Sequence, residues 1–153
     1  MLWKLCRFRE VGARRRVLFL EAAMWLLTAR IILLIVPFRR IARHLGTVAS
    51  PTDDGACPST TLPDPEPGNF AREIGWAIAC AARHVPFKAI CLPQAIAAKQ
   101  MLRRRGVSSV LHFGVATSDK LKGLEAHAWL DAASVKVTGY PVASTFTEVV
   151  RFK

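Results

Sequence analysis

Two residues in the second half of the chain have the types and the setting of a nucleophile and its base. Cys91 stands directly before the apolar run "LPQAIAAKQMLRRRG", and His127 follows in "EAHAWLD". The free N–H groups and the dipole of a helix N-terminus lower a thiol pKa, and the same groups can receive an oxyanion. A histidine on a facing strand can accept the thiol proton. The pair could therefore perform acyl transfer through a thioester.

Both residues also have a plainer explanation. A lone cysteine ahead of a helix is more often a packing residue, and a histidine within a strand is more often a hydrogen-bonded structural one. His112, in "VLHFGV", has a setting similar to that of His127 and no obvious partner. We therefore assign His112 a structural role, and the two residue types alone leave both interpretations of Cys91 open.

Length and composition indicate one domain with a substantial core, because the chain has 153 residues of which 52% are hydrophobic. The four cysteines, Cys6, Cys57, Cys80 and Cys91, form no CxxC pair and no tight cluster. We expect reduced thiols in a cytoplasmic protein rather than a disulfide framework. The Cys and His residues do not pair at metal-ligand spacing, so no metal and no other cofactor is expected.

A net charge of +11 invites an acidic partner. The basic residues fall into separate clusters at 14–16, 39–40 and 103–105, without interleaved aromatic residues or a nucleic-acid motif. We interpret the clusters as solvated helix ends and expect no nucleic-acid partner.

The most apolar run, Val17 to Phe38, predicts a long helix. Its length would suit a membrane span, but Glu21 and Arg30 would each cost about 2–3 kcal/mol near a bilayer centre. We favour a core or partner-binding helix, with peripheral membrane contact through residues 17–38 as the second interpretation. Pro37 should end this helix, and "RRIARHLG" predicts a short second helix closed by Gly46.

Composition divides the chain into an N-terminal helical segment (1–46), a linker rich in Pro, Asp, Ser and Thr (47–68) and a core (69–153). Within the core, one helix is expected from an Asn69 N-cap to about His84, and another over 92–105. The runs "SSVLHFGVA", "LEAHAWLD" and "VKVTGY" then predict a small antiparallel meander. Helices followed by strands indicate an α+β fold.

The run "CLPQAIAAKQMLRRRG", followed by a β-run ending in "HFGVA" and then by "AHAWLD", resembles the lasso peptide biosynthesis B2 proteins. These belong to the transglutaminase-like superfamily of papain-type cysteine proteases. The resemblance extends upstream through "WAIACAARHVPFKAICL" and, more loosely, to "VPFRRIARHLG", so it covers most of the chain outside the linker. It implies N-terminal helices followed by a papain/transglutaminase-like core, whose nucleophile helix packs on a small antiparallel sheet.

The resemblance also implies an activity and partners. Such a protein would be a leader peptidase that cuts a lasso precursor, with Cys91 as the nucleophile and His127 as the base and then the acid. The chain resembles the split form, which relies on a separate leader-recognition protein (the B1-type RRE protein) and on an ATP-dependent lasso cyclase.

The family's third catalytic member is an acid that orients the histidine, usually on the strand after it. "VKVTGYPV" contains no such acid, and the nearest one downstream is Asp131, on the same strand face as His127. A straight strand would place Asp131 roughly 13 Å along the chain from His127, and Glu125 about 7 Å away. We take Asp131 as the candidate, which a bulge or turn would bring closer. An acid from elsewhere, a carbonyl and a water stay open.

Two other functions remain. The departure at the third acid suggests a catalytically impaired scaffold or interaction protein of the same fold in a maturation complex. The same thioester could alternatively be attacked by an amine, which would make the chain a transglutaminase-type acyl transferase.

Overall fold

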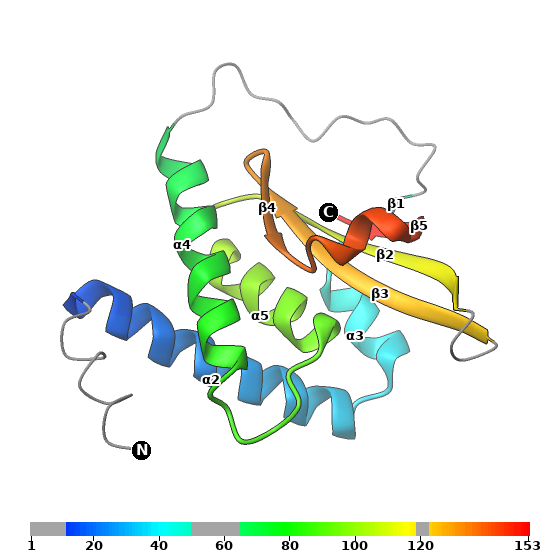
Figure 1. Cartoon of the computed structure of the whole chain (residues 1–153), viewed down its shortest axis with the longest axis horizontal. Coiled ribbons are helices and arrows are strands. Elements are labelled where there is room, and N and C mark those ends of the chain that lie inside the picture. Colours follow the sequence, from blue (N-terminus) through cyan, green and yellow to red (C-terminus); the bar gives the residue numbers. More distant parts are fainter. Residues whose placement is uncertain (1–11, 50–64, 119–122) are drawn as a thin grey trace.

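The computed structural model describes residues 12–49, 65–118 and 123–153 (Figure 1). Helices come first and the main strands follow, so the predicted α+β class is confirmed. The helices are α2 (Ala13–Ile35), α3 (Phe38–His44), α4 (Pro65–Ala82) and α5 (Cys91–Arg103). The strands are β1 (Val48–Ala49), β2 (Ser109–Ser118), β3 (Gly123–Ala132), β4 (Val135–Thr138) and β5 (Thr147–Phe152), with the short 3-10 helix η1 (Val142–Thr145) before β5.

The strands form one antiparallel sheet in the order β1-β5-β2-β3-β4. The predicted meander is present as β2, β3 and β4. The sequence analysis missed β5, which pairs with β2 on the side away from β3. Its run, "TEVVRF", contains β-forming valines and a phenylalanine but no regular alternation of polar and apolar residues, and the predicted strands ended at Tyr140. The chain therefore returns across the sheet through η1 before its last strand.

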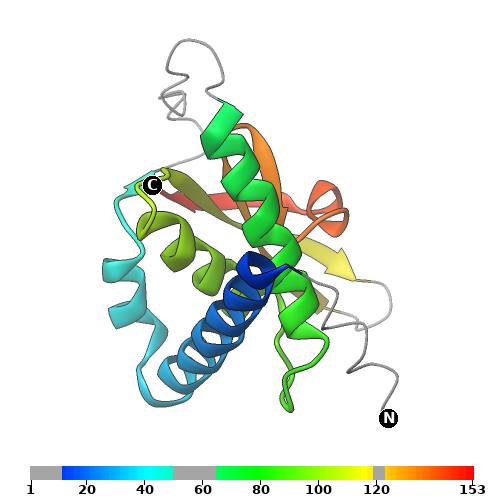
Figure 2. The same cartoon turned by 90° about the vertical axis from the view of Figure 1, so that its left-hand side faces the viewer.

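The helices cover one face of this sheet. Figure 2 shows α3 and α5 on one side of the strands and η1 on the other. Helix α2 packs against both α4 and α5, and its buried residues belong to the same core as those of the other helices and of the sheet. The N-terminal segment therefore shares a single core with the remainder of the chain. Small side chains on α4 and α5, Ala71, Ala77, Ala81, Ala95, Ala97 and Ala98, are fully buried in that core and permit close helix packing.

The observed helix boundaries depart most from the predicted ones around the linker. Helix α4 begins at Pro65, before the expected N-cap at Asn69, and the Asn69 side chain instead accepts a hydrogen bond from Arg72. Proline is well tolerated in the first turn of a helix because that turn needs no N–H there. Residues 50–64 of the predicted linker, together with Cys6 and Cys57, lie outside the described residues. The short helix closed by Gly46 is confirmed as α3.

Alternation along the strands separates two sets of side chains. On β3, Ala128, Leu130 and Ala132 belong to the core under the helices. Residues at odd positions of β3, which include His127 and Trp129, therefore lie on the opposite face, where η1 crosses. This outer face carries most of the polar and aromatic chemistry of the domain.

Candidate active site

Cys91 is the first residue of α5, as the sequence analysis required of a nucleophile at a helix start. Its side chain is partly buried and packs against the core. Ile90 precedes it in an extended conformation and supplies no side-chain cap to the helix. Pro93 has no N–H, so the main-chain donors at this end are those of Cys91 and Leu92, which make no hydrogen bond within the described residues. These donors suit an oxyanion.

Gln94 lies on the first turn of α5, where its amide could have served an oxyanion. The Gln94 side chain instead donates a hydrogen bond of 2.6 Å to the Ala89 carbonyl, in the segment just before the helix. This contact fixes the chain that leads into Cys91. Gln94 therefore stabilises the segment that precedes Cys91.

His127 lies on β3 beyond the part of that strand that pairs with β4, which extends only over 130–132. Its Nε2 atom is 2.8 Å from the main-chain carbonyl oxygen of Gly139, just after β4. The imidazole also stacks on Phe146, with ring centroids 4.9 Å apart, and against Trp129 at 6.2 Å. Trp129, two residues after His127 on β3, shares its face of the sheet.

The Gly139 carbonyl determines which nitrogen of His127 carries the proton. A carbonyl oxygen can only accept, so Nε2 must be the donor and, in the neutral ring, Nδ1 is left with a lone pair. Within the described residues, Nδ1 has no hydrogen-bond partner. A histidine held this way is in the tautomer that a general base needs.

Gly139 occupies a position that admits no side chain. Its φ angle is +88°, and an added Cβ would lie 2.6 Å from the Cβ of Trp129 and 2.8 Å from the Ala128 carbonyl oxygen. The carbonyl that orients His127 therefore comes from the chain after β4, where the family resemblance would place an acid. A glycine at the end of a strand can signal such a close approach, but the sequence analysis did not use it.

Asp131, the candidate third residue, lies on the same sheet face but has other partners. Tyr140 donates to both of its carboxylate oxygens, at 2.7 and 2.9 Å. Burial, reinforced by this hydrogen bond to Asp131, raises the pKa of the Tyr140 phenol well above its usual range. Among the described residues, no hydrogen bond or ion pair joins Asp131 to His127, so the catalytic role of Asp131 stays a prediction.

His112, expected to have no obvious partner, is in fact well bonded. Its Nδ1 donates to Glu148 at 2.8 Å, and its Nε2 lies 3.5 Å from Asp131. Arg151 holds the same Glu148 carboxylate with two hydrogen bonds. Burial of Glu148 opposes its ionisation, but the hydrogen bonds from His112 and Arg151 outweigh it and lower the Glu148 pKa. His112 therefore has the structural role that we predicted, with partners that the sequence did not reveal.

Trp129 connects the two histidines. Its ring stacks on His112, with centroids 5.4 Å apart and planes 5° from parallel, as well as on His127. It lies flat over Gly114 on β2, where an added Cβ would come within 2.8 Å of the indole. Trp129 is only 7% exposed, so it excludes water from one side of His127.

Cys91 and His127 approach the sheet from different faces. Cys91 is on the helix side, whereas alternation places the His127 side chain on the outer side. Within the described residues, no hydrogen bond, ion pair or ring contact joins them. A direct meeting would have to occur around the edge of β3, where pairing with β4 has stopped.

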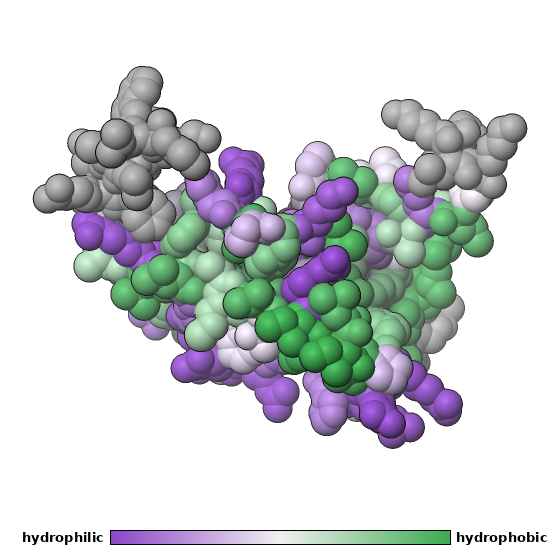
Figure 3. All heavy atoms as spheres, turned by 90° about the horizontal axis from the view of Figure 1, so that it is seen from below, coloured by the Kyte–Doolittle hydropathy of each residue, from purple (hydrophilic) through white to green (hydrophobic). Residues whose placement is uncertain are grey.

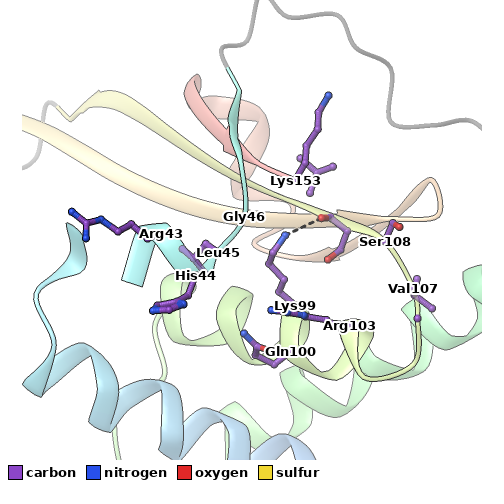
Figure 4. Close-up of a pocket in the computed structure, with 13 residues that line it drawn as sticks. Arg43, His44, Leu45, Gly46, Lys99, Gln100, Arg103, Val107, Ser108 and Lys153 are labelled. Carbon is purple, nitrogen blue, oxygen red and sulfur yellow. Dashed lines mark hydrogen bonds between the residues drawn. The ribbon is translucent and has the colours of Figure 1, made fainter. Parts of the chain in front are cut away.

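A separate hollow of about 750 Å³ lies toward the other end of α5 (Figure 4). The buried Lys99 amine donates to the carbonyls of Ser109 and Phe152 there. Burial, with a smaller contribution from Arg103, lowers the Lys99 pKa to about 8. Both bonds tie α5 to the sheet, so Lys99 positions the helix that carries Cys91.

Comparison with protein families shows to which superfamily the chain belongs. A model of the transglutaminase-like superfamily matches residues 32–151, so the chain belongs to that superfamily. Searches of curated proteins and of solved structures gave no match. The matched range extends from the end of α2 to β5 and contains Cys91 and His127. The superfamily includes cysteine proteases and transglutaminases, in which a cysteine thioester carries the acyl group.

Proposed function

We propose that this protein is a cysteine protease that removes the leader from a lasso peptide precursor. It would act with a separate leader-recognition protein and an ATP-dependent cyclase, in the cytoplasm. The observation that carries the proposal is the pairing of an uncapped helix start at Cys91 with a histidine whose tautomer is fixed for base catalysis. The sequence resemblance to lasso B2 proteins supplies the substrate class.

In the proposed reaction, Nδ1 of His127 takes the thiol proton of Cys91 as the sulfur attacks the scissile carbonyl. The N–H groups of Cys91 and Leu92 stabilise the oxyanion of the tetrahedral intermediate. His127 then returns its proton to the leaving amine, and the leader remains as a thioester. Water, deprotonated by His127, attacks this thioester and releases the leader with a free carboxylate.

This reaction requires Cys91 and His127 to approach each other, because no contact joins them within the described residues. The open edge of β3 beside His127 gives the imidazole a route toward the helix side, since no strand covers it there. Catalytic hydrogen bonds are often long in a free enzyme and shorten when substrate binds. We propose that the bound leader, delivered by its recognition protein, closes this gap.

The test is cleavage of a lasso precursor in the presence of its recognition protein, followed by mass spectrometry. Cys91→Ala should abolish cleavage and Cys91→Ser should nearly do so, while both proteins stay folded. Cys80→Ala is the matched control, because Cys80 is the other described free cysteine and is also partly buried. Full activity of Cys91→Ala would overturn the proposal.

Two further outcomes separate the alternative functions. A wild-type protein that cleaves nothing but is still required for cyclisation would be the scaffold suggested by the missing acid. A product joined to an added amine, rather than one carrying a new carboxylate, would indicate acyl transfer.

A further inference from the structure

Helix α2 buries one side and leaves the opposite side apolar. Its buried residues, Leu18, Ala22, Leu26 and Ala29, follow helical spacing and face α4 and α5. The opposite side carries a row of large apolar side chains that stay exposed. We call this row, with Phe38 at the start of α3, the apolar ridge: Val17, Leu20, Met24, Leu27, Ile31, Ile32, Leu34, Ile35 and Phe38.

The ridge extends along most of α2. From Val17 to Ile35 it extends roughly 27 Å along the helix axis. Its exposure is greatest at the far end, where Leu34 is 70% and Ile35 is 75% exposed. Figure 3 shows apolar side chains gathered on this side of the molecule, with hydrophilic ones around them. Contiguous apolar patches of this kind on soluble proteins mark interaction sites.

Two polar side chains of α2, those of Thr28 and Glu21, are engaged within the protein rather than on the ridge. Thr28 bonds back to the Met24 carbonyl of its own helix, and Glu21 is directed to Arg105, with contacts of 2.6 and 3.2 Å. A protein interface of this size would normally include several hydrogen bonds between partners, and the ridge offers no side chain to make them. A lipid surface needs none.

Cations border the most exposed end of the ridge. Arg39, Arg40 and Arg43 follow Phe38 on α3 and are exposed. In the part of the chain that the structure describes, no ion pair or side-chain hydrogen bond engages them. Glu21 is the one acid in residues 12–49, and it is already paired with Arg105. Apolar side chains beside free arginines match the boundary between acyl chains and anionic headgroups.

We infer that the apolar ridge and the adjacent arginines bind the surface of a membrane that contains anionic lipid. Helix α2 is long and apolar enough to span a bilayer by composition. Spanning would strip Leu18, Ala22 and Leu26 from the core and separate Glu21 from Arg105, so α2 instead lies along the interface. This inference does not depend on the proposed peptidase activity.

The experiment is flotation of the full chain with vesicles of phosphatidylcholine, with and without 30% phosphatidylglycerol, across a salt series. Binding should need the anionic lipid and weaken with salt. The double variant Leu34→Gln/Ile35→Gln should lower the partition coefficient about tenfold or more. Leu124→Gln/Val149→Gln is the matched control, because both residues are exposed apolar positions on the sheet, and it should bind normally.

Single-charge variants test the contribution of the arginines beside the ridge. Arg39→Gln and Arg40→Gln should each weaken vesicle binding about fivefold. Lys136→Gln, which removes one charge at an exposed position of β4, should change vesicle binding little. No binding to anionic vesicles would overturn the inference. A dimer by light scattering that the Leu34→Gln/Ile35→Gln variant disrupts would show a second copy to be the occupant. A monomeric protein that does not bind vesicles would indicate that a protein partner covers the ridge instead.

Discussion

His112 and His127 lie on the same face of the sheet and stack on the same indole, yet their hydrogen-bond partners are of opposite kinds. Two carboxylates surround His112, and Arg151 shares one of them. His127 has one main-chain carbonyl and two aromatic neighbours. Among the residues that the structure describes, no acid contacts His127, where the family resemblance would place one, while two acids contact the other histidine.

The difference shows what each site can do. His112 joins β2 to β3 and β5 through an ion network, which serves the packing of the sheet. Within the described residues, His127 is anchored at one nitrogen and has no hydrogen-bond partner at the other, an arrangement that suits the proposed proton transfer. A neutral carbonyl stabilises an imidazolium less than a carboxylate does, so we expect a working but less activated base than an acid would give.

Substitution of the two histidines by Gln gives the largest predicted contrast. His127→Gln should lower kcat/KM for precursor cleavage about 10³-fold, because it removes the base and keeps the fold. His112→Gln should leave kcat/KM within a few-fold and lower thermal stability instead. The measurements are single-turnover cleavage and thermal unfolding of both variants. Equal losses of activity would remove the distinction between the two histidines.

Gly139→Ala should have the next largest effect. The added Cβ clashes with Trp129 and the Ala128 carbonyl, and a non-glycine residue is strained at φ +88°. We expect a loss of about 3 kcal/mol in the free energy of unfolding, measured by urea titration, together with reduced cleavage. Gly106→Ala is the control, because φ is +70° there but no atom lies within 4 Å of the new Cβ. Gly106→Ala should lower the free energy of unfolding by less than Gly139→Ala does.

Glu148→Gln tests the network around His112. We expect this variant to lower the free energy of unfolding by about 1 kcal/mol, since the ion pair between Glu148 and Arg151 is partly exposed. The lowered Glu148 pKa means that the folded protein holds this proton less tightly than the unfolded chain. The wild-type contribution is therefore complete above the unfolded Glu pKa and is lost as the pH falls through the folded one.

Chemical denaturation at several pH values between about 3 and 7 measures this contribution. The difference between wild type and Glu148→Gln should shrink as the pH falls. A difference that stays constant to the lowest pH would contradict the ion network.

Asp131→Asn should have the smallest effect. If Gly139 orients His127, this variant should keep cleavage within about fivefold, because Asn can still accept from Tyr140. A loss of 10²-fold or more, with KM unchanged, would instead make Asp131 the orienting residue. Glu125→Gln, at an exposed position of β3, is the control and should be silent.

Much of the site was predictable from local patterns. Cys91 stands at the first residue of α5 because an apolar helix pattern and a preceding proline-containing segment define that start. The alternation in "EAHAWLD" correctly grouped His127 and Asp131 on one face. Short-range periodicity is sufficient for such statements, since each depends on residues a few positions apart.

The partners of these residues were not predictable in the same way. The carbonyl of Gly139 reaches His127 because the chain leaves β4 beside the open edge of β3, and a main-chain oxygen leaves no mark in residue type. Glu148 reaches His112 only because β5 pairs with β2 across the sheet. The sequence placed no strand there, so it gave His112 no partner.

The amino-acid sequence by itself determined the α+β class, the helix that begins at Cys91, the strand carrying His127 and the apolar character of α2. The tertiary structure decided which face of each element is covered. It buried one side of α2 and left the apolar ridge open, and it set His127 against a carbonyl rather than an acid. Periodicity is a property of neighbours along the chain, whereas burial and hydrogen-bond partners depend on segments brought together from far apart.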